Sequence, residues 1–378
     1  MADFIKSYLD YTTEQESPQA FHSWVAITMI SAAMKRQTWL ERGFRSLRLY
    51  PNTYVMIVGP PGRQKKSTAI RLGMDMLYEA DPTVQIFQER MTPEGVMLAM
   101  NRINASVKGQ TINMESALLL VASELTTMFG ADQTQAARMI SFLTRWYDCP
   151  DIFPYLTAAH GKLEFFNLYP TFLGASPETM LNIIPSEAQG GLLSRMVFVY
   201  STDRKRVPRP KAGTGYANLV DQLKLIGSYR GEFVETKAAQ DYFDEWYMTV
   251  PDEVNPKTAT FMERLPDHAL KLACILAASR DTMTIDVKLM DAAISTMTGA
   301  IPGIEHVMAH VSASDYAQLT MRVLAQVTQF APLGKRQVYN ANNFTASVEE
   351  IDQALSDLVE RRLIKETFVG SIPVYVLA

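Results

Sequence analysis

The sequence predicts a mixed α/β protein, in which a parallel sheet is preceded by helices and followed by a helical domain and a small C-terminal unit. Three observations lead to this fold class. A short apolar run, a glycine-proline turn and a helix-like segment follow one another over residues 53–70. A second apolar run, from Ala117, ends at the polar pair Ser123–Glu124, and residues 313–378 carry three helix signals before two short strands. Buried strands that alternate with helices are typical of a parallel sheet.

The bulk composition excludes several classes of protein. With 378 residues, of which 47% are hydrophobic, the chain is long enough for two or three domains with a core. Its net charge of −4 limits any nucleic-acid contact to a local basic patch. Cys149 and Cys274 lack metal-ligand spacing, which argues against a disulfide framework or a zinc site and fits a reducing cytosol. We find no signal peptide and no apolar run near ~20 residues, so we expect a soluble cytoplasmic protein without a membrane partner.

Residues 1–49 predict a helical N-terminal segment. Ser17 is a suitable N-cap, and Pro18 suits the first turn of a helix whose apolar residues recur at helical spacing up to Met34. His22 lies one step off that apolar stripe, so we interpret it as a structural residue and not a catalytic one.

The stretch TYVMIVGPPGRQKKSTAI, residues 53–70, has the layout of a phosphate-binding loop. Its candidate ligand-binding residues are Gly59, Pro60, Pro61, Gly62, Lys65, Lys66, Ser67 and Thr68. Backbone N–H groups of the turn and the positive end of the helix would cradle polyphosphate oxygens. A lysine would reach the β- and γ-phosphates of ATP, and a hydroxyl would hold Mg²⁺.

This loop departs by one residue from the usual spacing, G-x-x-x-x-G-K-[S/T]. Counted from Gly59, the pair Lys66 and Ser67 falls one position late, whereas Lys65 fits the spacing but leaves a lysine at the hydroxyl position. We choose Lys66 and Ser67, because Mg²⁺ needs an oxygen ligand, and we expect the Arg63–Gln64 pair to bulge outward. The alternative is a Gly-Pro turn followed by two solvated lysines.

The second apolar run, ALLLVASE, predicts a buried parallel strand with polar residues at its carboxyl end. Ligands of α/β nucleotide sites bind at such strand ends. Glu124 is therefore the candidate that polarises the attacking water. Ser123 stands where many P-loop ATPases carry a Mg²⁺-associated aspartate, and it would hold a metal-bound water without contributing charge. The alternative is a buried strand that ends in a surface glutamate.

Two further strand signals carry candidate residues. Residues 153–168 predict a hairpin, because two β-prone arms flank a glycine-containing tip, and that tip carries His160 and Lys162 as plausible phosphate ligands. A strand follows and ends at Ser176. Arg195 precedes the last apolar run, where a buried guanidinium needs an anionic partner. That partner is either the γ-phosphate of a nucleotide on an adjacent subunit or a carboxylate in a structural ion pair.

A basic segment, residues 204–211, follows this run. Its cations are Arg204, Lys205, Arg206, Arg209 and Lys211. Interleaved prolines and the glycines after them mark a linker. The cations, Arg204, Lys205 and Arg206 first, would track a nucleic-acid backbone, although an exposed basic linker without a ligand is just as common. Residues 206–312 then predict a linker and a helical lid.

The C-terminal residues 313–378 predict a winged-helix domain. Three helices precede two strands about a turn, and Ser347 with Glu350 has capping-box spacing at the third helix. That helix is acidic, which makes it a poor reader of the major groove. Docking of a protein partner is therefore at least as plausible as DNA binding.

Five stretches, taken in order, resemble a phage and mobile-element family of P-loop ATPases that are described as helicase-like AAA+ proteins. They are FIKSYLDYTTEQESPQAFHSW, YPNTYVMIVGPPGRQKKSTAI, SELTTMFG, SPETM and GGLLSRMVFVYS. The likeness covers residue 1 to about residue 310, and members often stand beside or are fused to primases. It implies an AAA+-like core over residues 50–205.

The resemblance also implies roles for single residues. The segment SRMVFVY is similar to the S-R-F motif of minichromosome-maintenance helicases and clamp loaders, which implies that Arg195 acts in trans as an arginine finger. The hairpin before the third strand is similar to the pore hairpin of ring helicases, which implies that Lys162 and His160 face DNA in a central channel. Ser176 would stand where such proteins sense the γ-phosphate.

Three hypotheses about function follow. The first is an ATP-driven, Mg²⁺-dependent motor on single- or double-stranded DNA, namely a replicative helicase of a phage or mobile element. It would be a homo-oligomer, most simply a hexameric ring, in the cytoplasm of a bacterial host, with a primase or another replication protein as a partner. The second is a nucleotide-gated loader or initiator with slow hydrolysis that binds a separate helicase through its winged helix; the irregular loop, Ser123 and the acidic final helix favour it. The third is a structural P-loop module that hydrolyses nothing.

Overall fold

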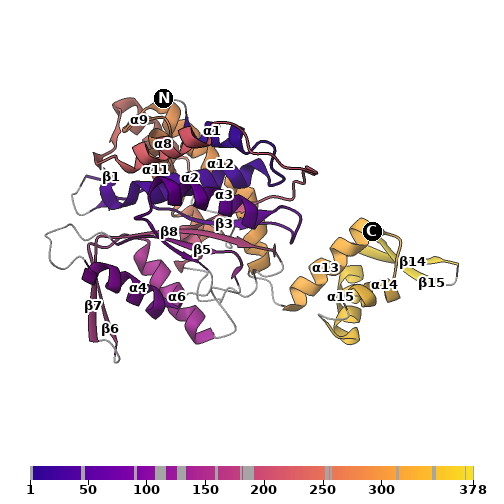
Figure 1. Ribbon diagram of the computed structural model, residues 1–378. Coiled ribbons are helices and arrows are strands. Elements are labelled where there is room, and N and C mark those ends of the chain that lie inside the picture. Colours follow the sequence, from indigo (N-terminus) through magenta and orange to yellow (C-terminus); the bar gives the residue numbers. More distant parts are fainter. Residues whose placement is uncertain are drawn as a thin grey trace. The chain divides into compact units, whose positions relative to one another are not determined.

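The computed structural model divides into two compact units, Met1–Met308 and Ala309–Ala378 (Figure 1). The described residues are 3–43, 47–88, 92–106, 116–125, 133–157, 161–178, 181, 191–251, 255, 258–311, 315–342, 346–370 and 372–377.

A five-stranded sheet, with every neighbouring pair of strands parallel, forms the centre of the first unit. In sheet order its strands are β4 (Gln85–Gln88), β5 (Ser116–Ala122), β8 (Leu168–Ser176), β3 (Tyr54–Val58) and β9 (Met196–Tyr200). Every residue of β3, β5 and β8 is buried. Strands that are covered on both faces read as continuous apolar runs, so the predicted α/β core with a parallel sheet is confirmed.

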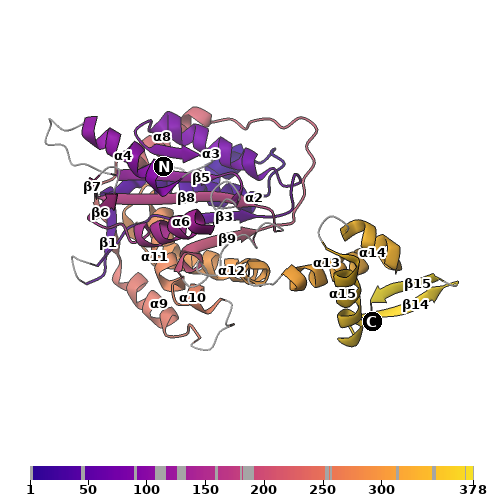
Figure 2. The ribbon, with the colours of Figure 1, turned by 90° about the horizontal axis from the view of Figure 1, so that it is seen from below.

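Helices cover both faces of this sheet (Figures 1 and 2). On one face lie α1 (Phe4–Tyr11), α2 (Gln19–Met34), α3 (Lys66–Ala80) and α8 (Tyr216–Gly227). On the other face lie α4 (Pro93–Ser106) and α6 (Gln133–Trp146). Helices α2 and α3 touch closely, because a Cβ at Gly73 would lie 2.4 Å from Val25 Cγ1.

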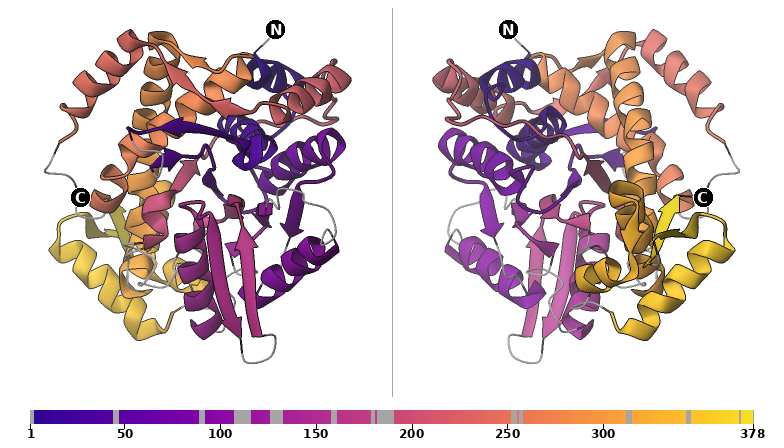
Figure 3. Two further views of the ribbon diagram at one scale, coloured as in Figure 1. Left: turned by 90° about the vertical axis from the view of Figure 1, so that its left-hand side faces the viewer. Right: turned by 90° about the vertical axis from the view of Figure 1, so that its right-hand side faces the viewer.

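The predicted hairpin is confirmed. Strands β6 (Ile152–Thr157) and β7 (Gly161–Phe166) pair antiparallel, with Thr157 opposite Gly161, and extend away from the sheet (Figures 1 and 3). The next strand, β8, begins at Leu168, directly after the hairpin, and ends at Ser176 as predicted.

The prediction that residues 1–49 form a helical segment is only partly right. After α2 the chain forms β1 (Thr38–Glu41) and β2 (Arg48–Leu49). Strand β1 also pairs with β10 (Gly231–Glu232), which lies far along the chain. Pairing with so distant a segment is invisible to local periodicity.

Within residues 206–312, predicted to be a linker and a helical lid, the described residues from α8 onward form helices and three short strands. Its further elements are β11 (Val234–Glu235), α9 (Lys237–Tyr247), α10 (Ala259–Met262), α11 (Leu265–Ser279), β12 (Thr284–Ile285) and α12 (Val287–Val311). Helix α11 packs against α2. The predicted lid therefore belongs to the same compact unit as the sheet up to residue 308.

The second unit has its own core, and its three helices and two final strands follow the predicted order, with one short strand, β13, that the sequence did not predict between the first two helices. Its elements are α13 (Asp315–Phe330), β13 (Leu333–Gly334), α14 (Lys335–Asn342), α15 (Val348–Glu360), β14 (Ile364–Val369) and β15 (Ile372–Leu377). The three strands form an antiparallel sheet, and the capping box of Ser347 and Glu350 is present. Val323, Leu355 and Ile364 lie in the apolar core.

Candidate phosphate-binding site

The candidate loop follows β3, which lies between β8 and β9 in the sheet. The carboxyl ends of these three strands are level with one another. Val58 of β3 lies opposite Ser176 of β8 and opposite Tyr200 of β9. The Gly59 N–H donates to the Ser176 carbonyl (3.3 Å), and the Ser201 N–H donates to the Val58 carbonyl (3.2 Å). The residues after these strands therefore share the sheet edge at which α/β folds bind ligands.

Two glycines shape the loop in different ways. A Cβ at Gly59 would lie 2.6 Å from the Ser201 carbonyl oxygen, so the close approach of the two backbones admits no larger residue. Gly62 has φ +71°, a conformation that side chains rarely adopt, but open space surrounds it. Glycine is therefore required at position 59 by lack of space, and it is favoured at position 62 by the backbone conformation.

Lys65 has the left-handed conformation (φ +47°) and directly precedes α3, which begins at Lys66. Glycine is the residue that favours this conformation, and the usual motif has glycine directly before its lysine. The backbone thus supports Lys66 and Ser67 as the working pair and places the extra residue between Gly59 and Lys65.

The expected outward bulge is only half right. Arg63 is exposed, but Gln64 is buried, with 1% of its surface exposed. Its Nε2 donates to the Asp203 carbonyl (3.5 Å), and its side chain lies beside Gly59. The loop absorbs its extra residue by packing Gln64 inward against the end of β9.

Lys66 reaches back over the loop that precedes it. Its Nζ donates to the carbonyls of Gly59 (2.6 Å) and Pro60 (3.1 Å), and the side chain is largely buried. Burial lowers the pKa of Lys66, while the charges of Glu178 and then Glu124 oppose that shift. The ammonium is therefore held at the mouth of the loop with two carboxylates in its field.

The first turn of α3 keeps its backbone donors available. The N–H groups of Thr68 and Ala69 donate to the Lys65 carbonyl (3.0 and 3.2 Å). Those of residues 63–67 donate to no other residue that the structure describes. Free N–H groups at a helix N-terminus, together with the helix dipole, form an anion-binding site.

The residues after β5 lie at the same edge as the loop. Ala122, the last residue of β5, is level with Gly174 of β8, so Ser123 and Glu124 follow β5 near the end of β8, and β5 lies two strands from β3. Glu124 is exposed and Ser123 is half-buried. Ser176 is buried, and its hydroxyl donates to the Pro177 carbonyl (2.9 Å). The sheet thus places Lys66, Glu124 and Ser176 at the same end of its strands. Of the latter two residues, Glu124 acts on Lys66 through its charge, which raises the pKa of the lysine.

The oxygen groups at this edge suit Mg²⁺, which prefers hard oxygen ligands and retains waters. The Ser67 side chain is exposed on the first turn of α3. Among the described residues, no group of three His, Cys, Asp or Glu forms a metal cluster. Ser67 and Ser123, at this end of the sheet, carry hydroxyl oxygens that could bind Mg²⁺ directly or through water.

A second carboxylate that the sequence reasoning did not single out lies here. Glu178 follows β8, receives a hydrogen bond from the Tyr200 hydroxyl, and lies 3.5 Å from His306 Nε2 of α12. The motif SPETM contains Glu178, but only the fold brings it to Tyr200 and His306.

Arg195 lies at the amino end of the parallel strands, whereas the loop lies at their carboxyl end. It precedes Met196, which pairs with Tyr54 at the amino end of β3. Its guanidinium donates to the Gly191 carbonyl (2.8 Å) and lies 3.4 Å from the Asp148 carboxylate, and the side chain is largely buried. Within one chain, Arg195 thus makes a structural ion pair with Asp148 as well as its hydrogen bond to Gly191.

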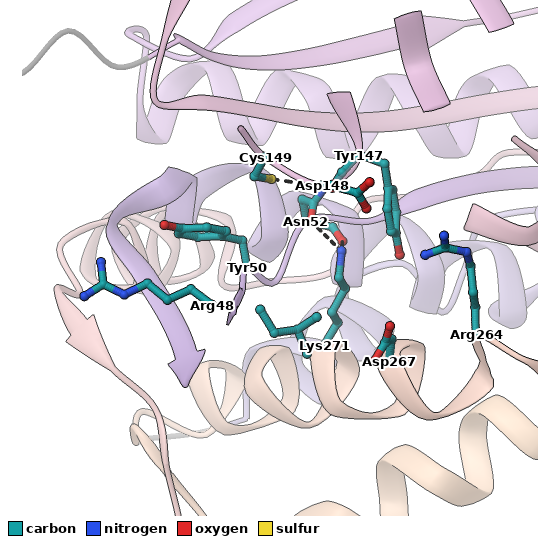
Figure 4. Close-up of a pocket in the computed structure, with 10 residues that line it drawn as sticks. Arg48, Tyr50, Asn52, Tyr147, Asp148, Cys149, Arg264, Asp267 and Lys271 are labelled. Atoms are coloured by element: carbon teal, nitrogen blue, oxygen red, sulfur yellow. Dashed lines mark hydrogen bonds between the residues drawn. The ribbon is translucent and has the colours of Figure 1, made fainter. Parts of the chain in front are cut away.

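A polar pocket of about 100 Å³ adjoins this ion pair (Figure 4). It is lined by Arg48, Leu49, Tyr50, Asn52, Tyr147, Asp148, Cys149, Arg264, Asp267 and Lys271. The buried Lys271 of α11 donates to Asn52 Oδ1 (2.6 Å), and its Nζ lies 3.7 Å from the centre of the Tyr147 ring. Burial lowers the pKa of Lys271 to about 8. In the sequence, this pocket is indicated by one feature, which is that Lys271 interrupts the apolar stripe of its helix.

The basic segment, residues 204–211, is not a free linker. The Lys205 ammonium donates to the Thr13 carbonyl, and the Val207 N–H donates to Glu16 (3.3 Å). Just beyond the segment, the Gly213 N–H donates to the Tyr11 carbonyl (2.9 Å). The segment thus runs along residues 11–16, and the Ser17 hydroxyl donates in turn to the Lys65 carbonyl (3.0 Å).

This arrangement places exposed cations near the loop. Arg204, Lys205 and Arg206 are all exposed. Lys162 lies in β7, where its backbone pairs opposite Leu156, whereas His160 lies outside the described residues. The structure therefore brings the basic segment into relation with the candidate site.

No protein-family model and no curated protein matches this chain. Among the described residues, no helix is long and apolar enough to cross a membrane.

Proposed function

We propose that this protein is an ATP-dependent motor on DNA with a P-loop, AAA+-like core. One observation carries the proposal: Lys66 closes over the Gly59–Lys65 turn between a buried parallel strand and a helix N-terminus, with carboxylates beside it. A buried ammonium and free helix N–H groups at the carboxyl ends of parallel strands are together suited to bind a nucleoside triphosphate.

In this mechanism the chain supplies position and charge, which dominate catalysis of phosphoryl transfer. Lys66 and the N–H groups of residues 63–67 would hold the β- and γ-phosphates, and Ser176 would contact the γ-phosphate. Glu124 would orient the attacking water. Ser67, and Ser123 through a water, would hold Mg²⁺, which when bound would supply positive charge beside the phosphate oxygens.

Arg195 would serve the neighbouring subunit. Because it lies at the far edge of its own sheet, it reaches a nucleotide only in an assembly, most simply a hexameric ring with heterologous contacts. Release of its ion pair with Asp148 would accompany that assembly.

DNA would contact the exposed cations Arg204, Lys205 and Arg206 and the hairpin residues Lys162 and His160, through phosphate charge rather than base identity. The second unit would act as a winged helix that docks a primase or another replication protein. Such a machine works in the cytoplasm of a bacterial host, if the chain comes from a phage or mobile element.

A second function, a nucleotide-gated loader or initiator, is favoured by one observation. Arg195 is already bonded inside its own chain, so a protein that seldom releases it would bind ATP and hydrolyse it slowly. Ser123, without charge at the metal position, points the same way.

The deciding experiment measures ATP hydrolysis and strand displacement by the purified full-length protein, with and without single-stranded DNA. A motor predicts DNA-stimulated hydrolysis and unwinding. A loader predicts ATP-dependent DNA binding without unwinding, and a structural module predicts no phosphate release. A protein that binds no nucleotide at all would contradict the whole proposal.

A further inference from the structure

Glu178 belongs to a compact cluster next to the candidate loop. The Tyr200 hydroxyl donates a hydrogen bond to its carboxylate, and burial together with this carboxylate raises the pKa of Tyr200 to about 12. His306 stacks on the Tyr200 ring, with ring centres 4.1 Å apart and planes 27° apart, and its Nε2 lies 3.5 Å from Glu178 Oε2. Glu178 is therefore fixed from two elements, β9 and α12.

Helix α12 is shaped to make this contact. A Cβ at Gly303 would lie 3.3 Å from Tyr200 Cβ, so glycine lets the helix approach the end of β9 closely. One turn later, His306 then reaches both the Tyr200 ring and the Glu178 carboxylate. The strand end and the helix thus act together on one carboxylate.

Glu178 is better placed than Glu124 to act on the group that Lys66 binds. It follows β8, the direct neighbour of β3, whereas Glu124 follows β5, one strand further out. Its side chain is 22% exposed, whereas Glu124 is an exposed residue. Of the two charges that act on Lys66, that of Glu178 has the larger effect.

We propose that Glu178 is the carboxylate that accepts the proton of the attacking water, and that Tyr200 and His306 are its positioning residues. This inference rests on the proposed ATP hydrolysis and reassigns one role within it, leaving Glu124 as a supporting charge. As the water oxygen bonds to the γ-phosphorus, one water proton passes to Glu178. The bond between the γ-phosphorus and the bridging oxygen breaks, and ADP leaves with that electron pair.

The test compares E178Q with E124Q. General-base loss lowers the rate by about 10²–10⁴-fold, so E178Q should lose at least about 100-fold in kcat while ATP affinity is kept or improved. E124Q should lose less. Y200F and H306Q should each lower kcat with little change in KM, and neither should lower it further in the E178Q background.

E79Q is the matched control. Glu79 also accepts a hydrogen bond from a tyrosine, Tyr216 (3.0 Å), but it lies at the far end of α3, about 20 Å from Lys66. E79Q should leave both hydrolysis and nucleotide binding unchanged. Thermal unfolding of each variant checks that it is folded.

A second readout does not depend on turnover. Because the proposal assigns Glu178 to the attacking water and not to the nucleotide, E178Q should bind ATP at least as tightly as wild type in an equilibrium titration. Wild-type kcat in E178Q, equal losses from Y200F with and without Glu178, or loss of ATP binding in E178Q would each overturn the inference. A wild-type protein that binds no ATP would instead refute the proposed function itself.

Discussion

At the scale of single residues, His22 and Lys66 are both buried titratable groups, but they differ in their partners. Lys66 donates to two loop carbonyls. His22, on α2, is 0% exposed, and neither of its ring nitrogens has a hydrogen-bond partner within the described structure. Burial lowers its pKa to about 4. Its interpretation as structural rather than catalytic agrees with this apolar setting.

His22 should make the protein sensitive to acid. Because its folded pKa lies below the usual value of about 6.5, the unfolded chain binds the proton more readily, and stability falls as pH drops from about 6.5 to 4. The full effect is roughly 3 kcal/mol. We expect H22L to lose less stability than wild type over this range in chemical denaturation. His268, also with its pKa lowered to about 4, contributes equally to both proteins. A stability difference that is the same at pH 7 and pH 4 would contradict this explanation.

At the scale of elements, local patterns predicted what neighbouring residues determine. The strand, turn and helix of 53–70, the hairpin and the Ser347 capping box all follow from residues that are close in sequence. The sheet order and the pairing of β1 with β10 depend on contacts between distant segments. For the same reason, the inward Gln64, the docked basic segment and the pairing of Glu178 with Tyr200 could not be predicted.

Gly59 and Gly62 offer a matched test of the loop. G59A places a Cβ against a backbone oxygen, and such overpacking costs about 1–3 kcal/mol and displaces the loop. G62A meets open space and bears only the strain of its positive φ, about 1 kcal/mol. We expect G59A to lose ATP affinity by at least about tenfold and G62A to keep most of it, as measured by titration. Equal losses in the two variants would show that steric contact with β9 does not shape the site.

At the scale of the whole molecule, the loop and Arg195 lie at opposite edges of one sheet. One chain therefore does not bring them together, so the proposed role of Arg195 as an arginine finger requires a second copy of the chain. The resemblance to ring ATPases suggested this role from the sequence, but the ion pair with Asp148 shows that the residue also has a partner within its own chain.

Mixing two inactive variants tests this arrangement. R195A should keep ATP binding but lose hydrolysis by about 10³-fold or more, as for removal of an arginine finger. K66A should lose binding but still offer Arg195 to its neighbour. Mixed assemblies should regain part of the hydrolysis, because an R195A subunit can receive the arginine of a K66A subunit. If mixtures stay inactive and R195A is merely destabilised as D148A is, Arg195 has a structural role only.

The proposed function depends most on Lys66 as the phosphate-binding lysine. Lys65 and Lys66 are adjacent and carry the same charge, but Lys65 is exposed whereas Lys66 closes over the loop. The direct measurement is ATP affinity by equilibrium titration of wild type, K66A and K65A at one salt concentration. We expect K66A to bind at least about 100-fold more weakly, since loss of a partly buried charge pair costs about 3 kcal/mol or more, while K65A stays within a few-fold of wild type. Equal affinities for the two variants would contradict the assignment of this loop as a nucleotide site.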